Sequence, residues 1–205
     1  MDDKNTEIQI FQAALKVFHK KGLAGARMQE IADEAGINKS MLHYYYRSKE
    51  KLFSEVFESS LTNFSGNFQL ILNGEDSSWE DKIRDICAYC IDFMNANPDL
   101  PIFIMNEMNQ QPECLLGILQ IDLDISQTRF FGQLREAMEK GEIRKTDPAQ
   151  VYVSLVSGIV HPFVAGPMMR KTTGLTLGDW PKFMDERKLF VCDMLITYLK
   201  TRSPA

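Results

Sequence analysis

The sequence predicts an all-α protein of about nine helices. Apolar residues recur at three- and four-residue spacing along most of the chain, which is the period of a helix with one buried face. No stretch of strand length alternates apolar and polar residues. Glycine, proline and capping residues separate the apolar stretches, as expected for helices joined by short connections. With 44% hydrophobic and 25% charged residues among 205, the composition is that of an ordinary globular chain.

The first helix is expected at residues 5–21. Gly22 follows its last two lysines, and a glycine after terminal cations is typical of a helix end. The apolar side chains at helical spacing are Ile8, Phe11, Ala14, Leu15 and Phe18.

Two short helices are expected at 28–34 and 39–45, joined by a sharp turn. Gly36 suits the left-handed backbone that ends the first helix, and Asn38 suits the N-cap of the second. Seven residues are too few for a stable isolated helix, so we expect Leu42 to anchor the second helix by packing. A short helix with polar and aromatic tips after a glycine turn is typical of a helix-turn-helix, whose second helix enters a DNA groove.

The remaining six helices are recognised by their apolar stripes and by the turn residues between them. Gly166 and Pro167 are expected to end the fifth of them. In the last helix, seven residues are expected to face the core: Phe183, Leu189, Phe190, Met194, Leu195, Tyr198 and Leu199. The expected ranges are 48–72, 79–95, 98–109, 113–140, 146–165 and 181–201.

Basic residues gather near the N-terminus although the chain is acidic overall. Residues 16–51 contain eight basic and four acidic side chains, a balance of +4; the net charge of the chain is −5, so the remainder carries −9. A basic segment on an acidic body fits a protein that contacts phosphate with one end only.

Three segments stand at fixed spacing in this basic region: Phe18-His-Lys-Lys-Gly22, Ile31-Ala-Asp-Glu-Ala-Gly-Ile-Asn38 and Leu42-His-Tyr-Tyr-Tyr-Arg-Ser-Lys-Glu-Lys-Leu52. Together, residues 8–56 resemble the DNA-binding domain of the TetR family of bacterial regulators. The family pattern reads Phe-x-x-x-Gly, Ile-Ala-x-x-Ala-Gly-Val-Ser and Leu-Tyr-x-Tyr-Phe-x-Ser-Lys-x-x-Leu. This chain departs from it at Met28, Ser40, Met41 and His43, which bears on the DNA sequence that would be recognised.

The resemblance implies a three-helix DNA-binding domain at 1–50, a linker helix at about 49–72, and a ligand-binding and dimerisation domain at 51–205. It implies a ligand-responsive transcriptional regulator, a repressor released from its double-stranded DNA operator by a small-molecule inducer. The few charges on the apolar faces predict a hydrophobic inducer, and the acidic, polar N-terminus predicts a cytoplasmic protein. Eight residues are expected at the DNA, with Lys49 on a phosphate at a helix N-terminus. They are Arg27, Gln29, Lys39, Ser40, Met41, His43, Tyr44 and Lys49.

The rest of the chain is expected to form a homodimer and to hold the inducer. The resemblance places the dimer contact on the last two helices, where small residues at 149–166 permit close helix approach. The inducer pocket is expected among aromatic and methionine side chains, since methionine fills adaptable apolar sites. Taken singly, such a residue is more often plain core than pocket lining. The candidates are Phe93, Met94, Phe103, Met108, Leu119, Phe130, Phe131, His161 and Phe163.

Other functions find less support in the sequence. Cys87 and Cys90 form a single C-x-x-C pair without matching histidines, whereas zinc sites use four ligands, so neither a metal nor a cofactor is expected. The three histidines are dispersed and no Glu-x-x-His pair occurs, so no enzyme is expected. No apolar run approaches the roughly 20 residues of a membrane span. The alternative is a regulatory partner-binding protein that keeps the fold of the N-terminal domain with little specific DNA binding.

Overall fold

The computed structural model describes residues 3–110 and 124–201. Within them the chain forms ten α-helices and one 3₁₀-helix, and no strand. The all-α prediction is confirmed, and the helix count is close to the expected nine. The chain divides into two compact units, residues 1–65 with 99–121 and residues 66–98 with 122–205. They are called unit 1 and unit 2 below, and each is described by itself.

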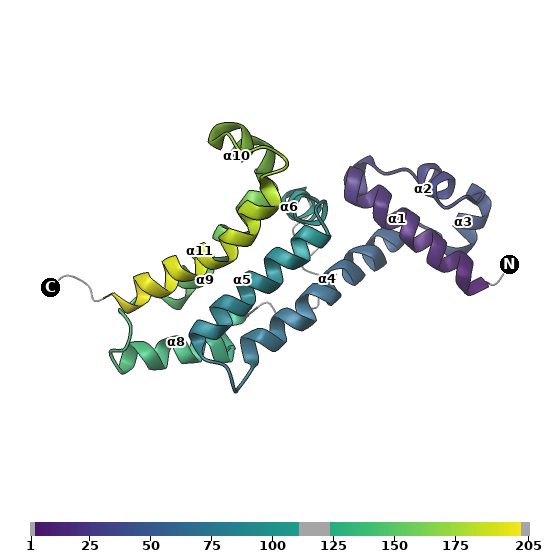
Figure 1. The fold of residues 1–205 in the computed structure, drawn as a ribbon. Coiled ribbons are helices and arrows are strands. Elements are labelled where there is room, and N and C mark those ends of the chain that lie inside the picture. The colour runs from purple at the N-terminus through teal and green to yellow at the C-terminus, as the bar shows by residue number, and fades with distance from the viewer. Residues whose placement is uncertain (1–2, 111–123, 202–205) are drawn as a thin grey trace. The chain divides into compact units, whose positions relative to one another are not determined.

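Unit 1 contains four helices and the first part of a fifth (Figure 1). Helices α2 and α3 have the predicted bounds, and Asn38 caps α3 by accepting a hydrogen bond from the Met41 N–H. Gly36 has a φ of 67°, the left-handed backbone expected of the turn. The helix-turn-helix prediction is therefore confirmed in geometry. The bounds are α1 Asp3–Gly25, α2 Met28–Glu34, α3 Lys39–Tyr45, α4 Lys49–Asn73 and α6 Leu100–Gln110.

Helix α1 does not stop at Gly22 as predicted. Gly22 has non-helical φ and ψ of 65° and 179°, which kinks the chain. A further turn then forms, closed by a hydrogen bond from the Ala26 N–H to the Gly22 carbonyl at 3.2 Å. The glycine was correctly recognised as a break, but the chain resumes helical structure for one turn before α2.

Aromatic packing joins α1, α4 and α6 within unit 1. Phe18, Phe53, Phe57 and Phe103 are all buried. The Phe53 and Phe57 ring centroids lie 5.8 and 5.6 Å from that of Phe103, in edge-on geometry that suits the ring quadrupoles. The half-buried His19 ring lies 4.8 Å from that of Phe103. This cluster fixes α6 against α1 and α4.

Burial makes unit 1 sensitive to acid through His19. Desolvation lowers the pKa of His19 below its usual 6.5, although Asp99 opposes this effect. The folded chain therefore binds this proton less readily than the unfolded chain, so stability is present above about pH 6.5 and is lost as pH falls below it. We expect the free energy of unfolding in urea to fall between pH 7.5 and 5.5, and His19→Gln to flatten that profile. His43→Gln is the control and should keep it; equal profiles for wild type and His19→Gln would contradict this role.

Unit 2 packs α5, α9 and α11 side by side (Figure 1). A Ser78 capping box begins α5, and the Asp147 carboxylate caps α9. The buried face of α5 includes Ile83, Ile86 and Ile91. The bounds are α5 Trp79–Ala96, a 3₁₀-helix Ile125–Gln127, α8 Arg129–Glu139, α9 Pro148–Val164, α10 Gly166–Thr173 and α11 Trp180–Lys200.

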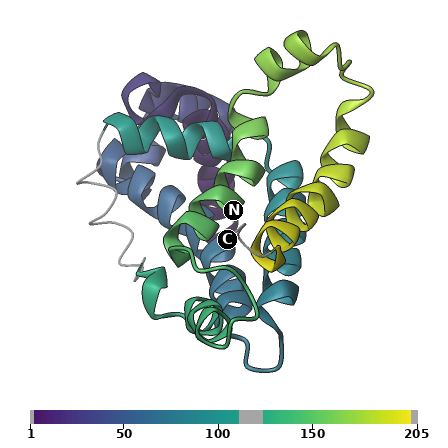
Figure 2. The same ribbon diagram turned by 90° about the vertical axis from the view of Figure 1, so that its left-hand side faces the viewer.

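One expected boundary in unit 2 is wrong, and one helix was not predicted. The predicted helix 113–140 is not continuous, because the 3₁₀-turn at 125–127 and the extended backbone of Thr128 precede α8. Gly166 and Pro167 do end α9, but they also begin α10, since proline is tolerated in a first helical turn. Figure 2 shows α10 and the following loop arching from α9 to α11.

The inward face predicted for α11 is partly wrong. Leu195 and Leu199 are buried as expected. Four other residues of the predicted set are 49–67% exposed within the chain, because Met184, Val191 and Cys192 occupy the inward face instead. The four exposed residues are Leu189, Phe190, Met194 and Tyr198.

Within the described residues, no single helix is long and apolar enough to cross a membrane. Helices α9 and α10 together have the necessary length and apolar composition, but the chain bends by 86° between them.

Candidate nucleic-acid interface

Helix α3 is held by one face and leaves the other face open. Leu42 is fully buried on its inner side, and Tyr46 at the C-cap is buried beside the helix. Burial raises the pKa of Tyr46 to about 12, with the carboxylates of Glu55 and Glu7 adding to the shift, so its hydroxyl stays protonated near neutral pH. The sequence predicted Leu42 as the anchor of α3; the structure adds Tyr46.

The outer face of α3 carries the predicted DNA contacts. Lys39, Ser40 and His43 are exposed, and Tyr44 is 79% exposed, a high value for an aromatic side chain. Its ring packs edge-on against Tyr45, with centroids 5.4 Å apart. Met41 is half-buried. The structure thus brings five of the eight predicted residues together on one helix.

Ion pairs divide the basic residues of unit 1 into two groups. Lys16 pairs with Glu34 at 3.0 Å, and Lys21 pairs with Glu30 at 2.9 Å. These two ion pairs join α1 to α2 and neutralise Glu30 and Glu34. Within the described residues no ion pair is recorded for the exposed basic residues beside α3, which leaves their charge available to phosphate. These are Arg27, Lys39 and Arg47.

Two further predicted residues have partners inside the chain. The Gln29 amide donates to Asp33 at 2.7 Å, a contact within α2. The Lys49 ammonium donates to the carbonyls of Leu23 at 2.7 Å and Ala26 at 3.1 Å. Since an ammonium has three N–H donors, Lys49 keeps one for a phosphate.

Arg47 is an exposed cation that the sequence-based set of contacts leaves out. It lies between Tyr46 and Ser48, directly before the N-terminus of α4, where the Ser48 hydroxyl accepts from the Lys51 N–H at 3.1 Å. A cation beside a capped helix N-terminus favours an anion. Its place beside Ser48, a residue type that often caps a helix N-terminus, was the signal that could have included it.

A family model described as "Bacterial regulatory proteins, tetR family" matches residues 10–56, which hold the whole helix-turn-helix. Residues 10–56 therefore match the TetR family that the sequence motifs resemble. The repressor SCO4008 of Streptomyces coelicolor is 26% identical over 83% of this chain and 84% of its own length. The repressor NicS of Pseudomonas putida is 34% identical over 50% of this chain and 48% of its own. Both the recognised family and its class, DNA-binding transcriptional regulators, are confirmed.

Solved structures show the same fold over nearly the whole chain. The regulator FadR from Bacillus subtilis, in complex with stearoyl-CoA, has a TM-score of 0.67, with 19% identity and coverage of 94% of this chain and 99% of its own. The hemolysin II regulator HlyIIR has a TM-score of 0.65, with 22% identity and coverage of 97% and 99%. These likenesses extend the shared fold beyond residues 10–56.

The residues predicted to line an inducer pocket lie in several places. Phe103 belongs to the aromatic core of unit 1, and Met108 is exposed there. In unit 2, Phe130 and Phe131 are buried on α8, whereas His161 is exposed and so is not the core histidine considered from sequence. Leu119 lies outside the described residues. Met94 is buried, and Phe93 and Phe163 are half-buried.

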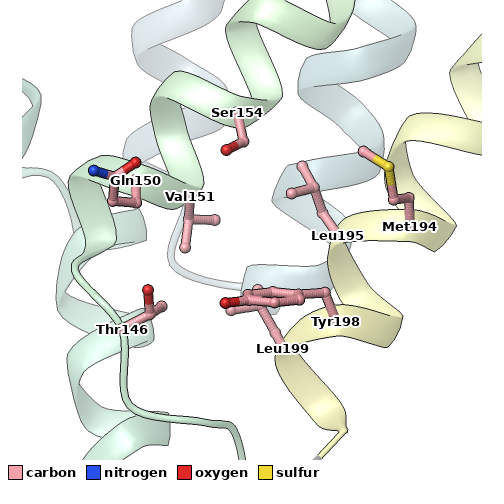
Figure 3. Close-up of a pocket in the computed structure, with 8 residues that line it drawn as sticks. All are labelled: Thr146, Gln150, Val151, Ser154, Met194, Leu195, Tyr198 and Leu199. Carbon is pink, nitrogen blue, oxygen red and sulfur yellow. The ribbon is translucent and has the colours of Figure 1, made fainter.

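Unit 2 has a groove between α9 and α11 (Figure 3). Its volume is about 440 Å³, and both polar and apolar side chains line it. Helix α9 contains no charged residue along its whole length. The exposed residues of α11 continue from the groove onto the surface. The lining residues are Thr146, Gln150, Val151, Ser154, Met194, Leu195, Tyr198 and Leu199.

Three cysteines of the described residues are buried, Cys87 and Cys90 on α5 and Cys192 on α11. Cys192 donates to the Ile83 carbonyl at 3.7 Å. A hydrogen bond with Cys192, together with burial, raises the pKa of Cys87, and burial raises that of Cys90 to about 12. The same hydrogen bond lowers the pKa of Cys192. Raised pKa values and burial make Cys87 and Cys90 typical of structural cysteines rather than reactive ones. Among the described residues, no group of three or more His, Cys, Asp or Glu side chains is placed to hold a metal ion.

Proposed function

We propose that this chain represses transcription by binding operator DNA through α3 and that a small hydrophobic molecule releases it. The observation that supports this most is the match to the TetR family model over residues 10–56, in which α3 presents Lys39, Ser40, His43 and Tyr44 outward. Two relatives are named repressors, which supports that direction of control. The action would take place in the cytoplasm, where the DNA is.

The contacts divide into those that position the protein and those that read the sequence. Lys49, Arg27 and Gln29 would lie against the DNA backbone. Lys39, His43 and Tyr44 could reach either a phosphate or a base edge. Ser40 and Met41 would meet base edges, with Met41 suited to a thymine methyl group. The exposure of this face of α3 supports the assignment. No observation favours the alternative of a partner-binding protein with little DNA affinity.

We propose the division 1–50 for DNA binding, with a linker helix at 49–72, and 51–205 for ligand binding and dimerisation. One helix-turn-helix offers few base contacts, so a dimer reading two half-sites would supply specificity. The uncharged α9 and the exposed apolar residues of α11 support a self-association face in unit 2. The inducer would act by favouring the state that does not bind the operator.

Lys49→Ala is expected to weaken binding to every DNA sequence and to reduce the salt dependence. A lost phosphate contact lowers the slope of log affinity against log salt by about one unit for duplex DNA. The measurement is a salt titration by fluorescence anisotropy, using DNA flanking the protein's own gene and an unrelated duplex. Lys182→Ala on α11 is the matched control and should keep the wild-type slope. An unchanged slope in Lys49→Ala would rule out the phosphate contact, and no binding of the wild type to its flanking DNA would refute the proposed function.

A further inference from the structure

A buried carboxylate of α6 contacts the backbone of α1. Glu107 is 1% exposed, and its Oε1 accepts a hydrogen bond from the Leu23 N–H at 2.9 Å. The kink at Gly22 explains why this N–H is available, because the turn after the kink has free amides at its start. Glu107 therefore caps residues 23–26, although it lies 84 positions away in sequence. A buried charge destabilises the fold unless it is hydrogen-bonded, so the fold strongly favours this contact.

The same turn is capped at its other end by a charge of opposite sign. The Lys49 ammonium on α4 holds the carbonyls of Leu23 and Ala26. Leu23 thus donates its N–H to a carboxylate and accepts at its carbonyl from an ammonium. Both side chains match the dipole of the turn. The negative carboxylate lies at its start, where the dipole is positive, and the positive ammonium lies at its end, where the dipole is negative. Residues 23–26, Glu107 and Lys49 are called the capped turn below.

The capped turn leads directly into the helix-turn-helix. Ala26 is its last residue, and Arg27 is the N-cap of α2, with extended backbone. The position of the turn therefore determines where α2 begins. Helix α6 is joined through residues 97–99 to α5, and α4 continues from unit 1 into unit 2. A change in α6 that withdraws Glu107 would free one end of the turn and loosen Lys49 at the other.

We propose that Glu107 is a positioning residue that couples α6 to the DNA-binding helices through the capped turn. It does not touch DNA; it holds the turn that orients α2 and Lys49. This rests on the proposed function only in its consequence for operator affinity. The coupling within unit 1 stands on the contacts of Glu107, Leu23 and Lys49 alone.

The first test uses the free protein and needs no DNA. Glu107→Gln keeps the size and an acceptor oxygen but removes the charge, so the Leu23 hydrogen bond should weaken. In ¹H–¹⁵N spectra the Leu23 amide should move upfield and exchange about tenfold faster, as expected for losing a charged acceptor. Shifts should extend into α2. Glu58→Gln, at an exposed position of α4, is the control and should leave the Leu23 amide unchanged. Shifts confined to α6 would overturn the proposal.

The second test measures operator affinity at a temperature where circular dichroism shows each variant fully folded. Glu107→Gln should weaken binding about tenfold, and Glu58→Gln should not. Lys49→Met combined with Glu107→Gln should weaken binding by less than the product of the single effects, because both act through one turn. If Glu107 only stabilised the fold, the folded Glu107→Gln variant would keep the wild-type affinity. That result would overturn the proposal. Were the wild type to bind no DNA, the proposed function would fail, and the amide shifts in α2 would still decide the coupling.

Discussion

Replacing Gly22 by alanine is expected to lower the free energy of unfolding by about 3 kcal/mol or more. Gly22 has a φ of 65° and a ψ of 179°, backbone that only glycine adopts readily, which costs other residues about 1–3 kcal/mol. A Cβ at this position would lie 2.4 Å from Glu107 Oε1, so the carboxylate must move. Losing its hydrogen bond to Leu23 in a buried site adds roughly 1–3 kcal/mol.

Urea unfolding of five variants separates backbone strain from the steric clash. Gly36→Ala tests positive φ alone, because nothing lies within 4 Å of its Cβ, and should cost about 1–2 kcal/mol. Gly25→Ala has no positive φ and should change stability by less than about 1 kcal/mol. In a Glu107→Ala background, Gly22→Ala should cost less than in the wild type, since the clash is gone. A Gly22→Ala effect no larger than that of Gly36→Ala would contradict the clash.

The local features of unit 1 were predictable because their signals lie close together in sequence. Gly36 and Asn38 set the turn by their own backbone and side-chain preferences, so α2 and α3 had the predicted bounds. The role of Glu107 was not predictable in this way. It caps a turn 84 residues away, and no local pattern marks an acid on an apolar helix as a long-range cap.

Helix α11 shows a second limit of sequence reasoning. Its apolar residues cover most of its circumference, so the period alone could not say which of them face the core. Only packing against α5 and α9 distinguishes buried Val191 and Leu195 from exposed Phe190 and Met194. Likewise Lys49 was chosen as a phosphate contact from its place at a helix N-terminus. Its carbonyl partners, Leu23 and Ala26, come from the unpredicted extra turn of α1.

The exposed face of α11 leads to the second large expected effect. Met194→Glu should convert the proposed dimer to monomers and lower operator affinity by a factor on the order of 100 or more. A carboxylate buried unpaired in an apolar interface costs several kcal/mol, and a symmetric dimer would carry it twice. The monomer would then read one half-site without the help of the second. Because Met194 is 49% exposed within the chain, the fold of the monomer should change little in stability.

Light scattering at micromolar concentration and operator titration are the two measurements. Leu70→Glu on α4 is the matched control, since Leu70 is also apolar and is 73% exposed, but it lies away from α9 and α11 in sequence. It should remain dimeric and keep its affinity. A dimeric Met194→Glu would show that the groove and the α11 face are not where two copies meet. A monomeric variant with wild-type operator affinity would contradict the link between dimerisation and DNA recognition. It would show that joining two half-sites adds nothing to operator affinity.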